Sequence, residues 1–298
     1  MTASQSPPKR SSSRSRGTNL FDSLYDRAVD DLLSVSVESL WVDTLAGPTH
    51  CLVAGDEHAQ PLLVFQGGNV TTPVTLAWVQ SLADDYRLVA PDTPGEPGLS
   101  ADERPADYGA WVVDVLDAFD LDAAPMVGLS HGAGVVLEAA TVAPDRVAAA
   151  ALVVPAGFGT AITPALARVV VPSLAYRLIP NRRLLRWALG PLFSAPVDDV
   201  PDVVVETVAL ALRTSDLSAE FPGPGGPDAL ADFDGLTLVV VADGDPFFPP
   251  ERTLDRAIAW LLGPVETRVL TDERHFLSPM GQEEVSDAVR SFLAADSR

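Results

Sequence analysis

The stretch Met126-Val127-Gly128-Leu129-Ser130-His131-Gly132-Ala133 carries the strongest structural signal in this sequence. It contains a G-x-S-x-G pattern that follows an apolar run and opens a segment rich in small residues, residues 131–143. This pattern is typical of a serine at a sharp turn from a strand into a helix, where crowding favours glycine two positions on either side. The first N–H groups of the helix would point toward negative charge that develops on a bound acyl group. Ser130 is therefore the predicted nucleophile.

The expected general base is His275, chosen from the four histidines of the chain. In the fold that such a turn indicates, the chain order is serine, then acid, then histidine. His50 and His58 precede the serine, and His131 begins the helix with its side chain directed away from the position of a base. His275 follows the last predicted strand. A chance G-x-S-x-G in a glycine-containing turn is the alternative interpretation, and it loses weight because an acid and a histidine follow in the required order.

The expected acid is Asp245, which has two rivals in Asp243 and Asp272. The predicted strand 236–242 runs into Asp243-Gly244-Asp245-Pro246. In this fold the carboxylate lies on the turn beyond the strand, from which it reaches the histidine loop. Asp243 is too close to the end of the strand, and Asp272 precedes His275 by only three residues. Asp245 is the better candidate because it lies within the turn, before a proline.

Short apolar runs alternate with amphipathic stretches on both sides of Ser130, which predicts parallel strands with crossover helices after an antiparallel start. The predicted strands are residues 40–43, 49–54, 62–66, 87–90, 126–129, 149–154, 236–242 and 266–270. The predicted core helices are residues 73–83, 107–119, 131–143, 251–262 and 283–294.

The alternation stops between residues 157 and 234, where helix boundaries are signalled and no strand is predicted. The signals are Thr163-Pro164, Asn181, Gly190 and Pro201. We therefore expect a helical cap inserted into the sheet domain. The predicted domains are a flexible basic tail of residues 1–18, a core of residues 19–156 and 235–298, and the cap of residues 157–234.

Two further stretches point to a family. Gly67-Gly68-Asn69 follows the third predicted strand, and Asp92-Thr93-Pro94-Gly95-Glu96-Pro97 follows the fourth. Together with the serine turn, they resemble the α/β-hydrolase superfamily over residues 40–293. The resemblance is strongest to a bacterial carboxylesterase-like subgroup with a Gly-Gly-Asn loop and an Asp-Thr-x-Gly-Glu-Pro stretch. It implies an α/β fold with a mostly parallel eight-stranded sheet, flanked by helices and interrupted by the cap.

The resemblance also implies an oxyanion hole formed by the N–H groups of Gly68 and His131. The family usually has histidine before the first glycine of that loop, whereas this sequence has Gln66. We expect Gln66 to hold the loop, because an amide offers both a donor and an acceptor. Asn69 and Phe247 are the candidate substrate-binding residues, although Phe247 could simply pack.

Composition limits the classes of partner. Of the 298 residues, 47% are hydrophobic, which is enough for a sizeable core, and the formal net charge of −21 repels nucleic acid and anionic lipid. Apolar runs such as residues 147–154 fall short of the roughly 20 residues that a membrane span needs. We expect a small-molecule substrate, no nucleic acid and no membrane.

The first residues of the chain and its single cysteine indicate the cellular compartment. Residues 1–16 hold basic residues and serines but lack the apolar core of a signal peptide. Cys51 is the only cysteine, so no intramolecular disulfide can form and a reducing compartment is compatible. We expect a cytoplasmic protein.

Several cofactor classes are disfavoured. The only lysine, Lys9, lies in the tail, which argues against a P-loop and a pyridoxal Schiff base. The sequence also has no H-E-x-x-H helix, no cysteine cluster and no G-x-G-x-x-G after a strand. We expect no cofactor and no metal site. Serine at position 130 argues against haloalkane dehalogenases and epoxide hydrolases, whose nucleophile is aspartate.

Arginines of the predicted cap could recognise an acidic substrate, but a solvated or acid-paired face is the preferred interpretation. They are Arg168, Arg177, Arg182, Arg183 and Arg186. Trp78, Trp111 and Trp260 lie on predicted core helices and are expected to pack.

These residues predict acyl transfer to water. Ser130 attacks a carbonyl carbon, His275 accepts its proton, and Asp245 keeps the imidazole in its productive tautomer. A small or medium carboxylic ester is the expected substrate, because a helical cap over an apolar pocket suits such acyl groups. Cofactor-free C–C hydrolysis, aminopeptidase action and perhydrolysis remain open on the same three residues, as does a non-catalytic ligand receptor. The sequence leaves the natural substrate and the oligomeric state open.

Overall fold

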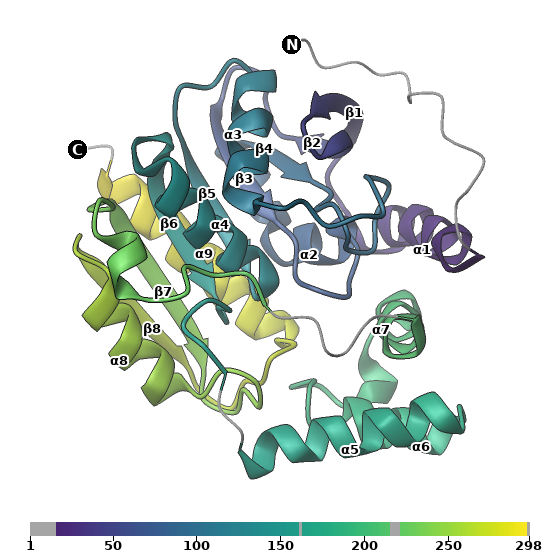
Figure 1. The fold of residues 1–298 in the computed structure, drawn as a ribbon. Coiled ribbons are helices and arrows are strands. Elements are labelled where there is room, and N and C mark those ends of the chain that lie inside the picture. Colours follow the sequence, from purple (N-terminus) through teal and green to yellow (C-terminus); the bar gives the residue numbers. More distant parts are fainter. Residues whose placement is uncertain (1–15, 161–162, 215–220, 297–298) are drawn as a thin grey trace.

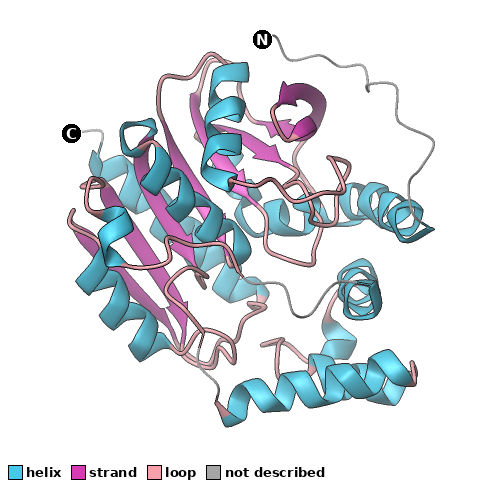
Figure 2. Ribbon diagram, in the orientation of Figure 1, coloured by secondary structure: helices cyan, strands magenta, loops and turns pink. Residues whose placement is uncertain are grey.

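The fold is described from a computed structural model of the chain, which covers residues 16–160, 163–214 and 221–296. One sheet of eight strands forms the centre, with helices on both of its faces (Figure 1, Figure 2). The strands are β1 Val37–Thr44, β2 Gly47–Ala54, β3 Gln60–Phe65, β4 Tyr86–Pro91, β5 Ala124–Leu129, β6 Val147–Val153, β7 Leu236–Ala242 and β8 Val265–Leu270. Their spatial order is β1-β2-β4-β3-β5-β6-β7-β8.

Strand β2 runs antiparallel to both of its neighbours, and the pairs from β4 through β3 to β8 are all parallel. Parallel strands covered by helices are buried on both faces and are apolar throughout. In agreement, every residue of β5 is buried. The predicted α/β-hydrolase fold is confirmed, and each predicted strand overlaps an observed one, with shifts of a few residues at the ends.

The helices divide between the two faces of the sheet. Helices α3 Tyr108–Ala118, α4 His131–Val142 and α8 Pro250–Trp260 bury apolar side chains in the cluster on one face. Helices α2 Thr72–Val79 and α9 Pro279–Asp296 do so on the other. The described residues also include four short 3₁₀ helices: Gln80–Asp84, Pro144–Arg146, Val197–Asp199 and Pro227–Leu230.

Helix α1, Arg16–Leu32, was not expected from the sequence. Its buried side chains, Phe21, Leu24, Tyr25 and Ala28, follow the i, i+3, i+4, i+7 spacing of one helical face. Their apolar spacing was therefore an available signal for this helix. The predicted tail of residues 1–18 lies mostly outside the described residues, and α1 begins at Arg16.

The described residues between β6 and β7 form three α-helices, two of which lie at the bottom of Figure 1 while the third lies above them at the right-hand side. They are α5 Pro164–Leu178, α6 Arg182–Leu189 and α7 Asp202–Thr214. Their boundaries follow the local chemistry: Thr163 and Asn181 accept N-cap hydrogen bonds from Leu166 and Leu184, and α6 ends at Gly190. The division of the chain into core and cap stays a prediction.

The three connecting helices share an apolar cluster with α1 and α2. It includes Val169, Leu189 and Val204 from the connecting segment, Phe21 and Leu24 from α1, and Val74 from α2. The connecting segment is thus packed against the part of the chain that follows β3. Within the described ranges, none of the helices is long and apolar enough to cross a membrane.

Candidate active site

Ser130 lies at the turn between β5 and α4 in a strained backbone conformation. Its φ of 52° falls in the left-handed region, which non-glycine residues rarely adopt. A Cβ on Gly128 would lie 2.5 Å from Ala133 Cα, and one on Gly132 would lie 2.2 Å from the Phe65 carbonyl oxygen. Both positions therefore exclude side chains. The Ser130 N–H donates to the Val153 carbonyl at 2.8 Å, which fastens the turn to β6.

Three side chains meet beside this turn in one hydrogen-bonded series. His275 Nε2 lies 2.9 Å from Ser130 Oγ, and His275 Nδ1 lies 2.8 Å from Asp245 Oδ2. All three residues are buried. They come from the ends of β5, β7 and β8, and the carboxyl ends of parallel strands share one edge of the sheet. The three candidate catalytic residues are thus brought together by the topology.

The carboxylate of Asp245 is oriented by its own turn. Its Oδ1 accepts hydrogen bonds from the backbone N–H groups of Phe247 at 2.8 Å and Phe248 at 3.1 Å, which leaves Oδ2 for His275. Both rivals are exposed. Asp243 Oδ2 instead accepts the Asp272 N–H at 3.1 Å and joins the turns after β7 and β8. The geometry therefore favours Asp245 over both.

The loop after β3 is held by Gln66. The Nε2 group of this buried side chain donates to the carbonyls of Val70 at 2.7 Å and Pro97 at 3.0 Å. Its Oε1 accepts from Thr72 Oγ1 at 2.8 Å and from the Thr93 N–H at 2.9 Å. Glutamine thus uses both donors and both acceptor sites of its amide, as its place in the sequence predicted.

Gly68 of the same loop packs directly against His131. A Cβ on Gly68 would lie 3.1 Å from His131 Cβ, so a side chain there would be crowded. The loop is further fixed by the Gly67 N–H, which donates to Thr75 Oγ1 at 3.0 Å. The two residues expected to form an oxyanion hole are therefore neighbours across the loop and the start of α4.

The loop after β4 supports the glycine loop from the other side. Glu96 Oε2 accepts the Asn69 N–H at 2.8 Å, and its Oε1 accepts from Arg104 at 3.1 Å. His131 Nε2 lies 3.4 Å from Glu96 Oε1. Burial nevertheless lowers the pKa of His131, with the charge of Glu96 acting in the opposite direction.

A small cavity opens beside Ser130 and His275. It has a volume of about 30 Å³, and both Gly67 and Gly68 line it. Its apolar walls are Val70, Val74, Trp78, Leu129, Val154 and Phe276. Trp78, which was expected only to pack, is half-buried and lines this cavity. The helix that follows the glycine loop therefore contributes a wall to the site.

The two candidate substrate-binding residues are placed differently. Asn69, with a φ of 63°, forms the turn of the glycine loop. The ring of Phe247 packs edge-on against His275, with centroids 4.9 Å apart. Neither is among the described residues that line the cavity beside Ser130. Their role in binding substrate stays a prediction.

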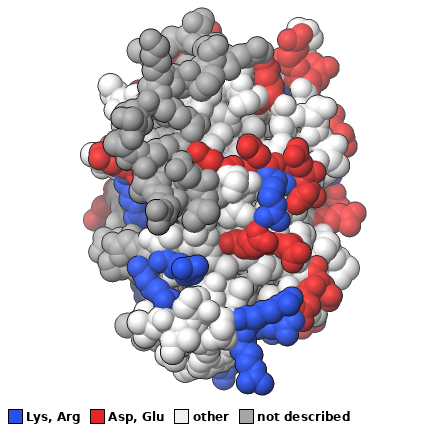
Figure 3. All heavy atoms as spheres, turned by 90° about the vertical axis from the view of Figure 1, so that its right-hand side faces the viewer, with Lys and Arg blue, Asp and Glu red and all other residues white. Residues whose placement is uncertain are grey.

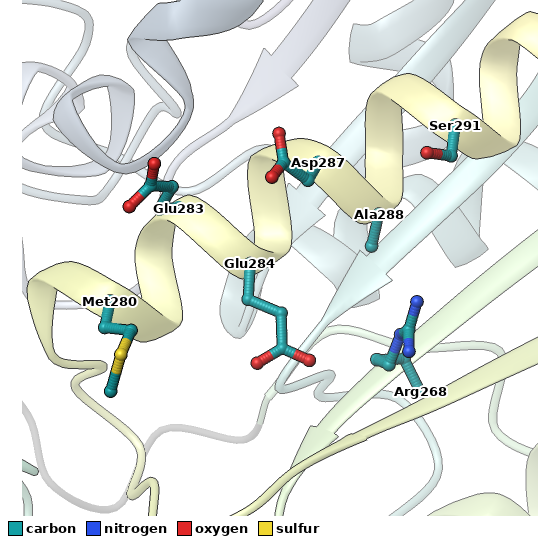
Figure 4. A pocket seen from close by; sticks show the side chains of 7 residues that line it. All are labelled: Arg268, Met280, Glu283, Glu284, Asp287, Ala288 and Ser291. Atoms are coloured by element: carbon teal, nitrogen blue, oxygen red, sulfur yellow. The ribbon is translucent and has the colours of Figure 1, made fainter.

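Charged side chains also gather outside the cavity that Ser130 lines. Figure 3 shows basic side chains gathered at the lower end of one face, the end where α5 and α6 lie in Figure 1. There, Arg186 pairs with Asp198. A more open hollow of about 290 Å³ lies between α9 and β8, where acids of α9 such as Glu284 stand near Arg268 (Figure 4). Its lining includes no residue of the hydrogen-bonded series.

Among the described residues, no group of three or more His, Cys, Asp or Glu side chains is arranged to hold a metal ion. The expected absence of a cofactor stays a prediction.

Comparisons with known proteins agree with this architecture. A model of the Alpha/beta hydrolase family matches residues 67–288. Carboxylesterase YbfK of Bacillus subtilis is 23% identical over 283 residues, which cover 92% of this chain and 93% of that protein. The structure of naproxen esterase from Bacillus subtilis superposes with a TM-score of 0.79 at 20% identity, over 94% of this chain and 99% of the esterase.

A shorter similarity concerns a different reaction. The 2-hydroxymuconate semialdehyde hydrolase of a Pseudomonas species is 35% identical over 119 residues, which cover 36% of this chain and 40% of that enzyme.

Proposed function

This chain belongs to the Alpha/beta hydrolase family, and from that premise we propose that it hydrolyses small or medium carboxylic esters through an acyl-enzyme on Ser130. One observation carries the proposal: Ser130, His275 and Asp245 form a buried hydrogen-bonded series at the turn before α4. Full-length similarity to a carboxylesterase supports the choice of an ester.

The geometry supports a defined direction of proton transfer. A carboxylate at Nδ1 favours the tautomer in which Nδ1 carries the proton and Nε2 accepts one. His275 Nε2 then takes the Ser130 proton as the oxygen attacks the carbonyl carbon. The protonated imidazole returns this proton to the departing alcohol, and a water molecule, activated in the same way, hydrolyses the acyl-enzyme. Asp245 Oδ2 stabilises the imidazolium in both steps.

We place the oxyanion at the N–H groups of Gly68 and His131. The close contact between these residues and the four hydrogen bonds of Gln66 support a preorganised loop at this position. Donors that are fixed before the reaction stabilise developing charge without reorganisation. This role requires only the backbone N–H of His131 and not its side chain.

The test is turnover of p-nitrophenyl acetate and butyrate by the wild-type protein and by Ser130→Ala. We expect wild-type hydrolysis of both esters, loss of it in the variant, and labelling of Ser130 alone by a fluorophosphonate. A parallel panel with aminoacyl amides, a vinylogous diketone and hydrogen peroxide separates the ester reaction from peptide, C–C and peracid chemistry. Unchanged ester turnover in Ser130→Ala would exclude this residue as the nucleophile, and a protein that binds esters without turnover would be a receptor.

A further inference from the structure

A second cavity adjoins the one beside Ser130. Its volume is about 140 Å³, against about 30 Å³ for the cavity that Ser130 itself lines. Since one water molecule needs about 10–15 Å³ on this scale, the smaller cavity holds little more than an acetyl-sized group. Val74, Trp78 and Phe276 line both. The two spaces therefore share these side chains as a common wall.

The common wall is fixed relative to the base. Trp78 and Phe276 pack edge to face with ring centroids 6.2 Å apart, and Phe276 follows His275 directly in the chain. The Phe276 N–H donates to the Leu192 carbonyl at 2.8 Å, and its carbonyl accepts from the Ser194 N–H at 2.9 Å. The segment that carries the cap helices is thus hydrogen-bonded to the histidine loop. The part of the larger cavity's lining that Phe276 supplies is therefore fixed relative to the neighbouring His275.

The lining of the larger cavity is mostly apolar. Apolar side chains come from α1, α2, the start of α7 and the histidine loop, among them Leu32, Ala77, Val204 and Leu277. The only charged residue among those that line it is Asp199, which is exposed. The amide of Gln282 donates to the Leu277 carbonyl at 3.0 Å. Such a lining favours a neutral apolar group and disfavours a carboxylate, because a buried charge requires a partner.

We propose that this larger cavity, here named the α7 chamber, receives the acyl chain of the substrate, and that the enzyme prefers neutral acyl groups of about six carbons over acetyl groups. This inference rests on the proposed ester hydrolysis at Ser130. The acyl group, rather than the alcohol, is assigned to the chamber because it must stay bound between acylation and deacylation. Apolar lining residues such as Trp78, Phe276 and Val204 suit a hydrocarbon chain that stays on the enzyme.

The decisive position is Val204, whose side chain is buried where α7 lines the chamber. We expect Val204→Trp to fill the space, and to lower the ratio of kcat/KM for p-nitrophenyl hexanoate to that for p-nitrophenyl acetate by about tenfold or more. Val205→Trp is the matched control, because Val205 is the next residue of α7 and does not line the chamber. Its ratio is expected to stay within about twofold of the wild-type ratio. Ala195→Phe blocks the chamber from a different segment and serves if Val204→Trp does not fold.

A third substrate tests the charge of the chamber. The wild-type protein should hydrolyse p-nitrophenyl hexanoate faster than both p-nitrophenyl acetate and the mono-p-nitrophenyl ester of adipic acid, which has the same chain length with a terminal carboxylate. The proposal that the chamber binds the acyl chain is wrong if both Val204→Trp and Ala195→Phe hydrolyse the acetate ester and keep the wild-type ratio of kcat/KM for p-nitrophenyl hexanoate to that for p-nitrophenyl acetate. Equal rates for the hexanoate and adipate esters would also contradict it. Absence of turnover for every ester overturns the proposed function itself.

Discussion

Two Ser-His-Asp series occur among the described residues, and their hydrogen-bonding patterns are similar. In the first, His275 joins Ser130 at 2.9 Å and Asp245 at 2.8 Å. In the second, His50 Nε2 lies 2.5 Å from Ser39 Oγ, and His50 Nδ1 lies 3.0 Å from Asp92 Oδ2. In both, the histidine and the aspartate are buried and Nδ1 faces the carboxylate. The arrangement of three side chains therefore cannot by itself identify a catalytic site.

The surroundings of the two serines separate them. Ser130 has a strained backbone before the N-terminus of α4 and lines a cavity with the glycine loop. Ser39 is an exposed residue in the middle of edge strand β1, paired with Leu52. A nucleophile needs space for an acyl group and N–H donors for the oxyanion, and a helix N-terminus supplies such donors. Ser39 lies within an extended strand, so no helix begins beside it.

The second series has a structural explanation. Asp92 is fully buried, and its Oδ1 accepts from Tyr25 of α1 at 2.9 Å while Oδ2 also accepts the Leu99 N–H at 2.7 Å. His50 belongs to β2. The series thus fastens α1, the two antiparallel strands and the loop after β4 to one another. The same hydrogen bonds that join segments here are, in our proposal, the ones that orient a base at His275.

Replacing each serine gives the sharpest contrast. Ser130→Ala should lower ester turnover by about 10⁶-fold, because it removes the nucleophile, whereas Ser39→Ala should leave turnover within about twofold. Steady-state kinetics on both variants, with circular dichroism to verify folding, measures the difference. Fluorophosphonate labelling of Ser39 in the wild-type protein would show that this serine is also nucleophilic, which would contradict the distinction between the two series.

The acids give the next largest effect. We expect Asp245→Asn to lower turnover by about 10⁴-fold with the fold intact, because the imidazole loses the group that holds its tautomer. Asp243→Asn and Asp272→Asn, on the same turns, serve as controls and should lose far less. Near-normal kinetics in Asp245→Asn would move the role to whichever of these two rivals is impaired.

Gln66 connects the two regions, because it bonds to the glycine loop on one side and to Thr93 and Pro97 of the Asp92 loop on the other. Gln66→Leu removes all of these hydrogen bonds. We expect turnover to fall by about 10²-fold through a misplaced oxyanion hole, with KM changed less than kcat. Gln66→His, which restores the residue usual at this position in the resembled family, should retain more activity. Equal kinetics for wild type and Gln66→Leu would show that the loop is held by other contacts.

Asp92 tests the structural series. The two carboxylate oxygens of Asp92 are within hydrogen-bond distance of Tyr25, His50 and Leu99. An asparagine would keep only one of these two oxygen acceptors. We expect Asp92→Asn to lower the free energy of unfolding by about 1–3 kcal/mol, and to lower turnover much less than Asp245→Asn does. Urea denaturation followed by circular dichroism measures the change. A loss of turnover equal to that of Asp245→Asn, with unchanged stability, would contradict a purely structural role.

The smallest effect concerns pH. Burial lowers the pKa of His131 in the folded protein, so the unfolded chain binds a proton there first as the pH falls. The free energy of unfolding should therefore decrease as the pH falls below about 6.5. His131 accounts for at most about 1.4 kcal/mol of this decrease for each pH unit. His131→Gln should show a smaller drop in the urea midpoint between pH 7.5 and 5.5 than the wild type. Identical drops would mean that other groups account for the pH dependence.

Local sequence chemistry was enough for several features. Gly128 and Gly132 around Ser130, the capping residues Thr163 and Asn181, and the apolar strands all act through near neighbours in the chain, so their patterns predict structure directly. The chain order of Ser130, Asp245 and His275 was informative because parallel topology brings the strand ends to one edge.

Contacts between distant segments decided the rest. The second series joins Tyr25, Ser39, His50 and Asp92, and no single stretch of sequence contains more than two of them. Trp78 lines the cavity because α2 packs beside the histidine loop, and the α7 chamber exists because α7 covers the gap between them. Periodicity shows which face of a helix is buried, but it does not identify the surface against which that face packs. The sequence alone thus determined the strands and most of the helices and indicated the candidate residues Ser130, Asp245 and His275, whereas the size and lining of the space beside Ser130 depend on long-range packing that only the tertiary structure specifies.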